Sequence, residues 1–142
     1  ACDLAKAHGI VIVAAAGNSG DADPDDDLNY PGRYSSVIAV AATDFNNVRA
    51  YWSSDGAELA VAAPGVSINS TYKGGGYAVL SGTSMASPHV AGTAALILAA
   101  HPSWSPDDVK SRLVATAHDL GATGWDTYYG AGLIDAYAAA AP

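Results

Sequence analysis

The segment TSMASPHVAGTAALILAA, residues 83–100, is the part of this sequence that decides the fold. It contains no Asp, Glu, Lys or Arg, and its composition predicts a helix that is apolar on all sides. A helix of this kind is buried in the middle of a domain rather than at its surface. Pro88 lies early in the segment, where a proline disturbs a helix least. We therefore expect this helix at the centre of the fold.

Three short apolar runs precede this helix and predict strands. Residues 10–16 (IVIVAAA), 37–42 (VIAVAA) and 59–63 (LAVAA) consist of small and β-branched apolar residues without polar alternation. Runs of this length and composition are typical of strands buried on both faces of a sheet. Because they alternate with helical segments, we predict the α/β class: a three-layer domain with a mostly parallel sheet and helices on both faces.

The remaining segments predict shorter elements. Residues 1–9 are typical of the last turns of a helix, ended by Gly9 in the left-handed conformation that follows many helices. Because no N-cap residue precedes this helix, we expect residues 1–142 to be part of a larger chain. The other expected elements are a hairpin of residues 67–71 and 77–80, a helix that starts with Ser105, Pro106 and a capping Asp108, and a last helix at 133–141.

Composition excludes several classes of function. The 142 residues, 50% of them hydrophobic, have the length of one domain. Asp and Glu number 14 against 6 Lys and Arg, so the net charge of −8 argues against nucleic acid or an anionic membrane surface as a partner. No apolar run approaches the roughly 18 residues of a membrane span. A single cysteine, Cys2, excludes an internal disulfide and a cysteine zinc cluster.

Ser84 lies where the loop containing Gly82 meets the start of the predicted helix. Backbone N–H groups at a helix start have no partner within the helix, and the helix dipole is positive there. Such groups can stabilise an oxyanion while a serine hydroxyl attacks a carbonyl carbon. The alternative role of Ser84 is that of a helix N-cap, which serine commonly serves. The position alone therefore does not distinguish a nucleophile from a cap.

Four strings resemble motifs of the subtilisin-like serine proteases, in that family's order and spacing: 14–20 (AAAGNSG), 30–34 (YPGRY), 63–66 (APGV) and 82–90 (GTSMASPHV). The resemblance implies that Ser84 is the nucleophile of a serine endopeptidase, which hydrolyses polypeptides through an acyl-enzyme. It also implies that the Asn18 side chain and the Ser84 backbone N–H bind the oxyanion. Members of the family are mostly secreted, so the resemblance implies an extracellular protein.

The family's triad follows the order Asp, His, Ser, and the Asp and His have no counterpart here. We therefore expect residues 1–142 to be the C-terminal half of a catalytic domain, with the N-terminal half as the partner that supplies both residues. His89 lies five residues after Ser84, about 140° around the helix and about 7.5 Å along it, and cannot reach the hydroxyl. The other histidines are expected to be solvated at helix ends: His8, His101 and His118.

Two alternatives follow from the missing triad residues. The isolated chain is expected to have no useful peptidase activity, so the chain is alternatively an inactive protease fragment or a binding module. A partial domain should also expose an apolar patch, through which it docks on its other half or self-associates. An α/β-hydrolase esterase is disfavoured, because its Gly-x-Ser-x-Gly motif would need glycine where Ala86 stands.

The resemblance also places a substrate cleft along the strand that ends at Ala15, Ala16 and Gly17. Thr83, next to the nucleophile, belongs to the same cleft, and Asn29 lies near its floor. Small side chains leave the backbone accessible to a bound peptide. The alternative is that these residues are small because they pack closely beneath a helix.

Three further residues take their expected roles from the same resemblance. Trp52 corresponds to an aromatic residue on the leaving-group side of the cleft, and its alternative is burial in the core. Met85, next to the nucleophile, is the position expected to be sensitive to oxidation. The Tyr30–Pro31 peptide bond corresponds to one that is cis in relatives.

Calcium, in a structural role, is the cofactor that the resemblance suggests. A weak family site uses backbone carbonyls that correspond to Gly32, Tyr34 and Val37, but Ala60 stands where a carboxylate often assists. Residues 21–27 (DADPDDD) are a second candidate, because carboxylate oxygens suit a hard cation. Their spacing does not match an EF-hand, and the alternative is a solvated loop.

Overall fold

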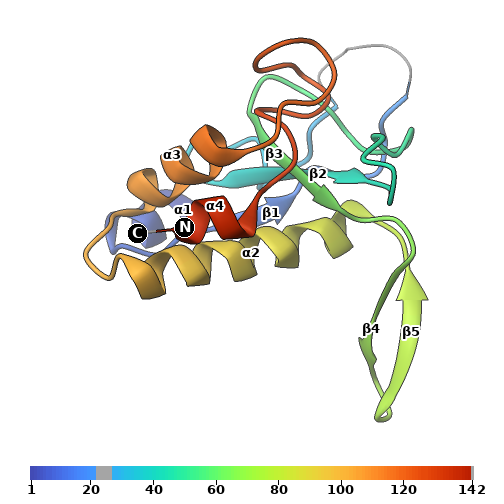
Figure 1. The fold of residues 1–142 in the computed structure, drawn as a ribbon, viewed down its shortest axis with the longest axis horizontal. Helices are drawn as coiled ribbons and strands as arrows, with labels where there is room; N and C mark the ends of the chain where they lie inside the picture. Colours follow the sequence, from blue (N-terminus) through green and yellow to red (C-terminus); the bar gives the residue numbers. More distant parts are fainter. Residues whose placement is uncertain (22–26, 142) are drawn as a thin grey trace.

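The computed structural model describes residues 1–21 and 27–141, which fold around a three-stranded sheet (Figure 1). In chain order the elements are α1 (Cys2–Ala7), β1 (Val13–Ala15), β2 (Ile38–Thr43), β3 (Leu59–Pro64), β4 (Ile68–Tyr72), β5 (Gly76–Leu80), α2 (Thr83–Ala100), α3 (Pro106–Thr116) and α4 (Ala136–Ala140). Among these residues, no helix combines the length and the apolarity needed to cross a membrane.

The sheet has the strand order β1-β2-β3, and both pairings are parallel. All of β2 and nearly all of β3 are buried, as expected for strands with apolar side chains on both faces. The predicted α/β class with a mostly parallel sheet is therefore confirmed. β1 is shorter than the predicted run 10–16, and only its central residue, Ala14, is buried. The reason is its place at the edge of the described sheet, where it pairs with β2 alone.

α2 contacts all three strands, and one face of it is buried: Thr83, Ala86, Val90, Thr93, Ala94 and Ile97. The opposite face is open to solvent, where Leu96 is 52% exposed. The expectation of a helix buried on all sides is therefore wrong for the described chain. The helix is apolar all round, but the sheet, α3 and α4 cover only part of it. Pro88 lies in the second turn, on the exposed side.

Two apolar clusters lie on opposite sides of β2. One fills the space between the sheet and α2 and includes buried side chains of α3 and α4. The other is covered by Leu28 and Tyr129, which come from segments without regular structure. Successive β2 residues alternate between the clusters, as the two-residue period of a strand requires: Ile38, Val40 and Ala42 in the first, Ala39 and Ala41 in the second.

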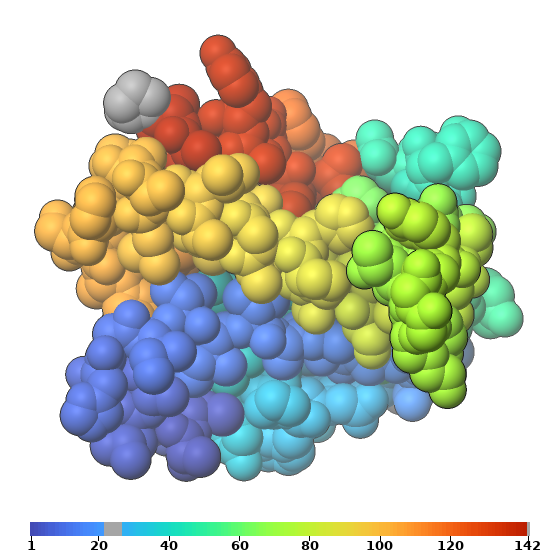
Figure 2. Space-filling view, turned by 90° about the horizontal axis from the view of Figure 1, so that it is seen from below, coloured from blue at the N-terminus to red at the C-terminus, as the bar shows by residue number. Residues whose placement is uncertain are grey.

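The strands β4 and β5 form the expected antiparallel hairpin. Its turn contains Gly74 and Gly75 with φ of 82° and 81°, a left-handed conformation that glycine adopts without a Cβ penalty. The hairpin extends from the body beyond the start of α2, and its side chains are mostly exposed (Figures 1 and 2). It therefore forms one wall beside α2 rather than part of the core.

The start of α3 confirms the predicted capping pattern. The Ser105 hydroxyl accepts a hydrogen bond from the Asp108 N–H, and the Asp108 carboxylate accepts one from the Ser105 N–H at 2.8 Å. This reciprocal arrangement satisfies two backbone donors that the helix itself leaves without partners. Pro106 occupies the first helical turn, where its missing N–H costs nothing.

The last helix is shorter than the predicted 133–141. α4 starts at Ala136 because Leu133 pairs instead with Ala62 and His118 in two short bridges. Asp135 caps α4 by accepting a hydrogen bond from the Ala138 N–H at 2.8 Å. Its other carboxylate oxygen lies 3.0 Å from Nε2 of His118.

The capping carboxylates should make stability fall in acid. Hydrogen bonds from Ser105 hold the pKa of Asp108 below its usual 3.8, and the backbone hydrogen bond from Ala138, then the charge of His118, lower the pKa of Asp135. Because both pKa values are depressed in the folded chain, their stabilisation is present above the ordinary value and is lost as the pH falls through the folded values. We expect Asp108→Ala/Asp135→Ala to lower the melting temperature at about pH 6 and to matter much less at about pH 2. Thermal unfolding measures this. If the variant melts below the unmodified chain by the same number of degrees at both pH values, the expectation is contradicted.

The two faces of α2 predict opposite effects for adjacent substitutions. Ile97→Ala removes a fully buried side chain and should lower the free energy of unfolding by about 2–5 kcal/mol. Leu96→Ala, the matched control on the exposed face, should cost less than about 1 kcal/mol. Urea denaturation of both variants measures the contrast. Equal losses would mean that the Leu96 face is covered in solution.

Candidate active site

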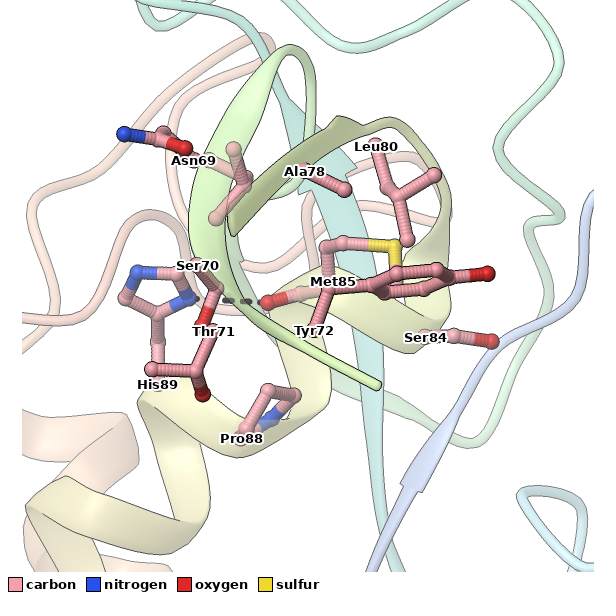
Figure 3. Close-up of a pocket in the computed structure, with 11 residues that line it drawn as sticks. Asn69, Ser70, Thr71, Tyr72, Ala78, Leu80, Ser84, Met85, Pro88 and His89 are labelled. Carbon is pink, nitrogen blue, oxygen red and sulfur yellow. Dashed lines mark hydrogen bonds between the residues drawn. The ribbon is translucent and has the colours of Figure 1, made fainter. Parts of the chain in front are cut away.

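Ser84 is the second residue of α2, and its side chain is exposed beside a groove between α2 and the hairpin (Figure 3). The groove has a volume of about 520 Å³. Tyr72 and Leu80 line it from the hairpin, and Met85 and His89 line it from α2. The candidate nucleophile therefore stands at a helix start that is open to a ligand, as the sequence predicts.

The side chain of Thr83 fastens the start of α2 to the segment that follows β1. Thr83 is fully buried. Its hydroxyl oxygen lies within hydrogen-bond distance of two acceptors, the Gly17 carbonyl oxygen at 3.1 Å and Asn18 Oδ1 at 2.9 Å. The same oxygen accepts a hydrogen bond from the Gly17 N–H at 3.2 Å, and the Thr83 N–H donates to Asn18 Oδ1 at 3.0 Å. Thr83 is thus engaged in internal bonds, which assign it the role of positioning Gly17 and Asn18.

These bonds fix which end of the Asn18 amide faces the site. Because Oδ1 accepts from both donors of Thr83, the amide nitrogen Nδ2 is the donor that remains. A methyl group built on Gly82 would lie 3.7 Å from Asn18 Nδ2 and 3.7 Å from the Ser84 backbone N. In the described chain, no acceptor receives the Ser84 N–H, whereas the Met85 N–H donates to the Gly82 carbonyl. Asn18 Nδ2 and the backbone N of Ser84 thus both lie within 3.7 Å of one point beside Gly82.

The predicted substrate strand is packed closely at its end. The Ala16 N–H donates to the Val40 carbonyl at 2.9 Å, and the Ala16 carbonyl accepts from the Asn29 N–H at 2.8 Å. Gly17 has a φ of 121°, and a side chain there would collide with the side chains of Asn29 and Ser54. The N–H and the carbonyl of Ala16 are therefore both hydrogen-bonded within the chain, and the Asn29 side chain lies against Gly17. The small residues in this segment serve close packing, whatever else they contact.

The other residues assigned to the cleft lie around this segment. Ala15 ends β1, and its carbonyl faces the turn at Gly32, where a built Cβ would lie 3.3 Å away. Trp52 is partly buried and packs against the larger apolar cluster, and its carbonyl accepts from the Gly20 N–H at 3.0 Å. Met85 is half-buried in the groove wall next to Ser84. The Tyr30–Pro31 peptide bond is cis.

The histidines of the chain are engaged or placed elsewhere. Nδ1 of His89 lies 2.9 Å from the carbonyl oxygen of Met85, so the ring bonds to its own helix (Figure 3). His101 stacks on Trp104 with ring centres 3.9 Å apart. His118 is paired with Asp135, and His8 ends α1. Within the described residues, no imidazole hydrogen bonds to the Ser84 hydroxyl, so this part of the chain shows no histidine placed as its general base.

Two of the three carbonyls expected to bind a metal ion already accept hydrogen bonds. The Tyr34 carbonyl accepts from the Val37 N–H at 2.9 Å, and the Val37 carbonyl accepts from the Lys110 ammonium at 3.3 Å. Ala60 is buried and has no oxygen in its side chain. Over residues 1–21 and 27–141, no three His, Cys, Asp or Glu side chains are placed to hold a metal ion. Of the Asp-rich segment 21–27, residues 22–26 lie outside the described residues.

A buried ion pair supports the loop that carries Asn18, and sequence reasoning missed it. Arg49 donates to Asp55 Oδ1 at 2.8 Å, and the two side chains are only 10% and 0% exposed. The guanidinium also donates to the Asp21 carbonyl at 3.2 Å and lies 4.6 Å from the centre of the Tyr128 ring. The only signal in the sequence was that Arg49, one of six basic residues, lies six positions before Asp55.

Comparison with known proteins identifies the family. The chain matches the subtilase family (peptidase S8) over residues 1–132. It is 56% identical to subtilisin DY of Bacillus licheniformis over 140 residues, which are 99% of this chain and 50% of that protein. It is 53% identical to a subtilisin of Bacillus pumilus, covering 97% of this chain and 49% of the relative. Subtilisin E of Bacillus subtilis is also 53% identical, over 97% of this chain and 35% of that protein.

This chain therefore belongs to the subtilase family, and the resemblance inferred from its motifs is confirmed. The family is one of serine proteases. The chain spans about half, or less, of the length of these curated relatives.

The Thr83 bonds predict that its hydroxyl matters more than its methyl group. Thr83→Val keeps the shape but leaves the Gly17 N–H and Asn18 Oδ1 without their partner, so it should cost about 1–3 kcal/mol of stability. Thr83→Ser, the matched control, keeps the hydroxyl and should lose less than half as much. Chemical denaturation of the two variants tests this, and a valine variant as stable as the serine variant would contradict it.

Proposed function

We propose that this chain supplies the nucleophile and the oxyanion hole of a secreted subtilisin-like serine endopeptidase. The observation that carries the proposal is that Asn18 Nδ2 and the backbone N of Ser84 both lie within 3.7 Å of one point beside Gly82, next to the exposed Ser84. Membership of a serine protease family supports the same chemistry. Secretion rests on the family resemblance. The substrate class is polypeptides, and the reaction is hydrolysis of a peptide bond through an acyl-enzyme.

In the proposed mechanism, Ser84 Oγ attacks the carbonyl carbon of the scissile peptide bond. The carbonyl oxygen gains negative charge and is stabilised by two preorganised donors, Asn18 Nδ2 and the Ser84 N–H. Both donors are held before the substrate arrives, because Thr83 fixes the Asn18 amide and the helix fixes its own backbone. The positive end of the α2 dipole favours the same oxyanion.

The proton of Ser84 must go to a base from outside the described residues. We assign this base to a histidine, oriented by an aspartate, in the N-terminal half of the same catalytic domain, with residues 1–142 as its C-terminal half. Three observations support such a partner. Subtilisin DY is about twice the length of this chain, and among the described residues β1 pairs on one side only and α2 leaves an apolar face open. Uncovered strand edges and apolar faces are surfaces that proteins normally bury.

Calcium remains part of the proposal as a structural ion, on the strength of the family resemblance and of the Asp-rich segment 21–27. Of its two ends, Asp27 is committed to the fold, because its Oδ1 accepts a hydrogen bond from the Asp55 N–H at 2.7 Å. No catalytic step depends on this ion. Calcium titration of the chain and of Asp25→Ala/Asp27→Ala separates a bound ion from a solvated loop.

The alternative function is a catalytically inactive fragment or binding module that lacks the triad Asp and His. One observation favours it: the described residues offer the Ser84 hydroxyl no general base. The free pair of donors weighs against it, because a module without acyl chemistry has no use for an exposed serine beside them.

Complementation tests the proposal. The chain alone should not hydrolyse a peptide p-nitroanilide, whereas the chain mixed or co-expressed with the Asp- and His-bearing half of a subtilisin should. Ser84→Ala should abolish that activity. Asn18→Ala should lower kcat by about 10²–10³, a magnitude that was measured for a subtilisin itself and does not come from this geometry.

Two controls make the outcome decisive. Ser103→Ala, an exposed serine in the turn after α2, should leave the complemented activity unchanged. Co-elution of the two halves in gel filtration shows whether they assemble. Assembly without hydrolysis would favour the inactive module, and hydrolysis that survives Ser84→Ala would contradict the assigned nucleophile.

A further inference from the structure

The connection between β2 and β3 exposes three large apolar side chains within a short stretch. Phe45 is 91% exposed, Val48 56% and Tyr51 80%. Phe45 is also the only phenylalanine in the chain. Single apolar residues are common on protein surfaces, but a group of them on one loop marks a contact surface for an apolar ligand or partner. Residues 44–51 are called the apolar loop below.

Hydrogen bonds hold the tip of the apolar loop in one conformation. Asp44 Oδ1 accepts from the N–H groups of Asn46 and Val48, at 2.8 Å and 2.9 Å. The Asp44 N–H donates to the Val48 carbonyl at 2.9 Å, and the Asn47 N–H donates to the Asp44 carbonyl at 3.1 Å. Because the backbone is already ordered, Phe45 can contact a ligand at a low cost in conformational entropy.

The two charged residues of the apolar loop are engaged within the chain. Asp44 accepts the backbone hydrogen bonds of the tip, and the Arg49 side chain is only 10% exposed and paired with the buried Asp55. The exposed surface of the loop is therefore dominated by the side chains of Phe45, Val48 and Tyr51. Such a surface favours an apolar or aromatic ligand over a charged one.

Backbone hydrogen bonds place the apolar loop close to Ser84. The Gly82 N–H donates to the Gly65 carbonyl at 2.8 Å, and the Gly65 N–H donates to the Thr43 carbonyl at 2.9 Å. Thr43 is therefore about 10 Å from Gly82, or two spacings between strands, and Phe45 follows two residues later. The loop lies at the same end of the molecule as the hairpin and the start of α2 (Figures 1 and 2).

The residues that follow the apolar loop are joined to the segment that carries Asn18. The Trp52 carbonyl accepts from the Gly20 N–H at 3.0 Å, and the Ser54 N–H donates to the Gly17 carbonyl at 3.0 Å. The Ser54 hydroxyl also accepts from the Ser19 N–H at 3.1 Å. The loop is thus fixed relative to both proposed oxyanion donors, so a peptide held at Ser84 meets it at a defined distance.

The surfaces that the other half of the domain is expected to cover lie elsewhere. The open edge of the described sheet belongs to β1, whereas the apolar loop follows the central strand β2 on the side of β3. The exposed Leu96 comes twelve positions after Ser84, about 18 Å along α2. Covering these two surfaces does not cover the apolar loop, which is left for a different ligand.

We propose that the apolar loop is an accessory binding site for the polypeptide substrate and receives a large apolar side chain, an aromatic one above all. An extended peptide advances about 3.3 Å per residue, so the bound side chain lies about three to five residues from the scissile bond. The leaving-group side is assigned, because the family resemblance places Trp52 there. This inference rests on the proposed function and adds a substrate preference to it.

Fluorine NMR tests the site on the chain alone. A fluorinated phenylalanine labels only position 45, and the label is placed in the Ser84→Ala variant so that no peptide can be cleaved. The labelled chain is titrated with two short peptides that differ in one residue, Trp or Ser. The Trp peptide should shift the resonance saturably, and the Ser peptide should not. Tyr51→Ser should weaken the shift, whereas Tyr137→Ser, which removes a similarly exposed tyrosine from α4, should not.

Several outcomes of the titration would overturn the proposal. No shift with the Trp peptide, or equal shifts with both peptides, would show that the loop does not select an aromatic side chain. A resonance that moves with the concentration of the chain alone would assign the loop to a second copy. A resonance that moves on addition of the Asp- and His-bearing half would assign it to that half.

Hydrolysis by the complemented enzyme tests where the side chain binds. Two peptide substrates share the residues around the scissile bond and carry Trp or Ser about four positions after it. The Trp substrate should have a kcat/KM about threefold to tenfold higher, through a lower KM. Phe45→Ser should remove this preference, and Tyr137→Ser should keep it.

The two experiments separate this inference from the proposed function. A complemented chain that does not cleave the peptide p-nitroanilide would contradict the proposed function, and the fluorine titration would still decide whether the loop binds an aromatic peptide. Cleavage of both substrates at equal kcat/KM would leave the proposed function intact and contradict the accessory site.

Discussion

The buried hydroxyl of Thr83 is the contact on which the candidate active site depends. It joins the segment after β1 to the first turn of α2, two elements that lie 66 positions apart in the chain. One side of this contact orients the Asn18 amide, and the other fixes the helix start that presents Ser84. A shift between the strand and the helix would separate the two proposed oxyanion donors. Catalytic hydrogen bonds of this type act because they are held in place before reaction.

Features encoded in short stretches could be predicted from the sequence. The strands appear as unbroken apolar runs, the α3 cap lies within residues 105–108, and the hairpin turn contains consecutive glycines. Ser84 and Asn18 were assigned through motifs, and the structure brings the segments that carry them together. What no local pattern contains is the bond between Asn18 and Thr83, because the partners are 65 positions apart. The same holds for the Val37 carbonyl and Lys110.

The errors also have a common physical cause. An apolar helix or strand indicates burial in the complete fold, but it does not say which neighbours are present in a given chain. α2 is therefore apolar on a face that the described residues leave open, and β1 is paired on one side only. Leu133 was assigned to a helix because alanine-rich sequence follows it, but pairing with Ala62 prevailed over helix propensity. Tertiary contacts decided each of these cases.

The open edge of β1 bears on how this polypeptide behaves in concentrated solution. A row of unpaired N–H and C=O groups is a template for strands of other molecules, and such edges start aggregation. Tethering to a covering segment would seal the edge at a high effective concentration. Without such a tether, copies of the chain compete for the same strand edge. Yield and solubility should then be higher in dilute solution and when another strand covers the β1 edge early.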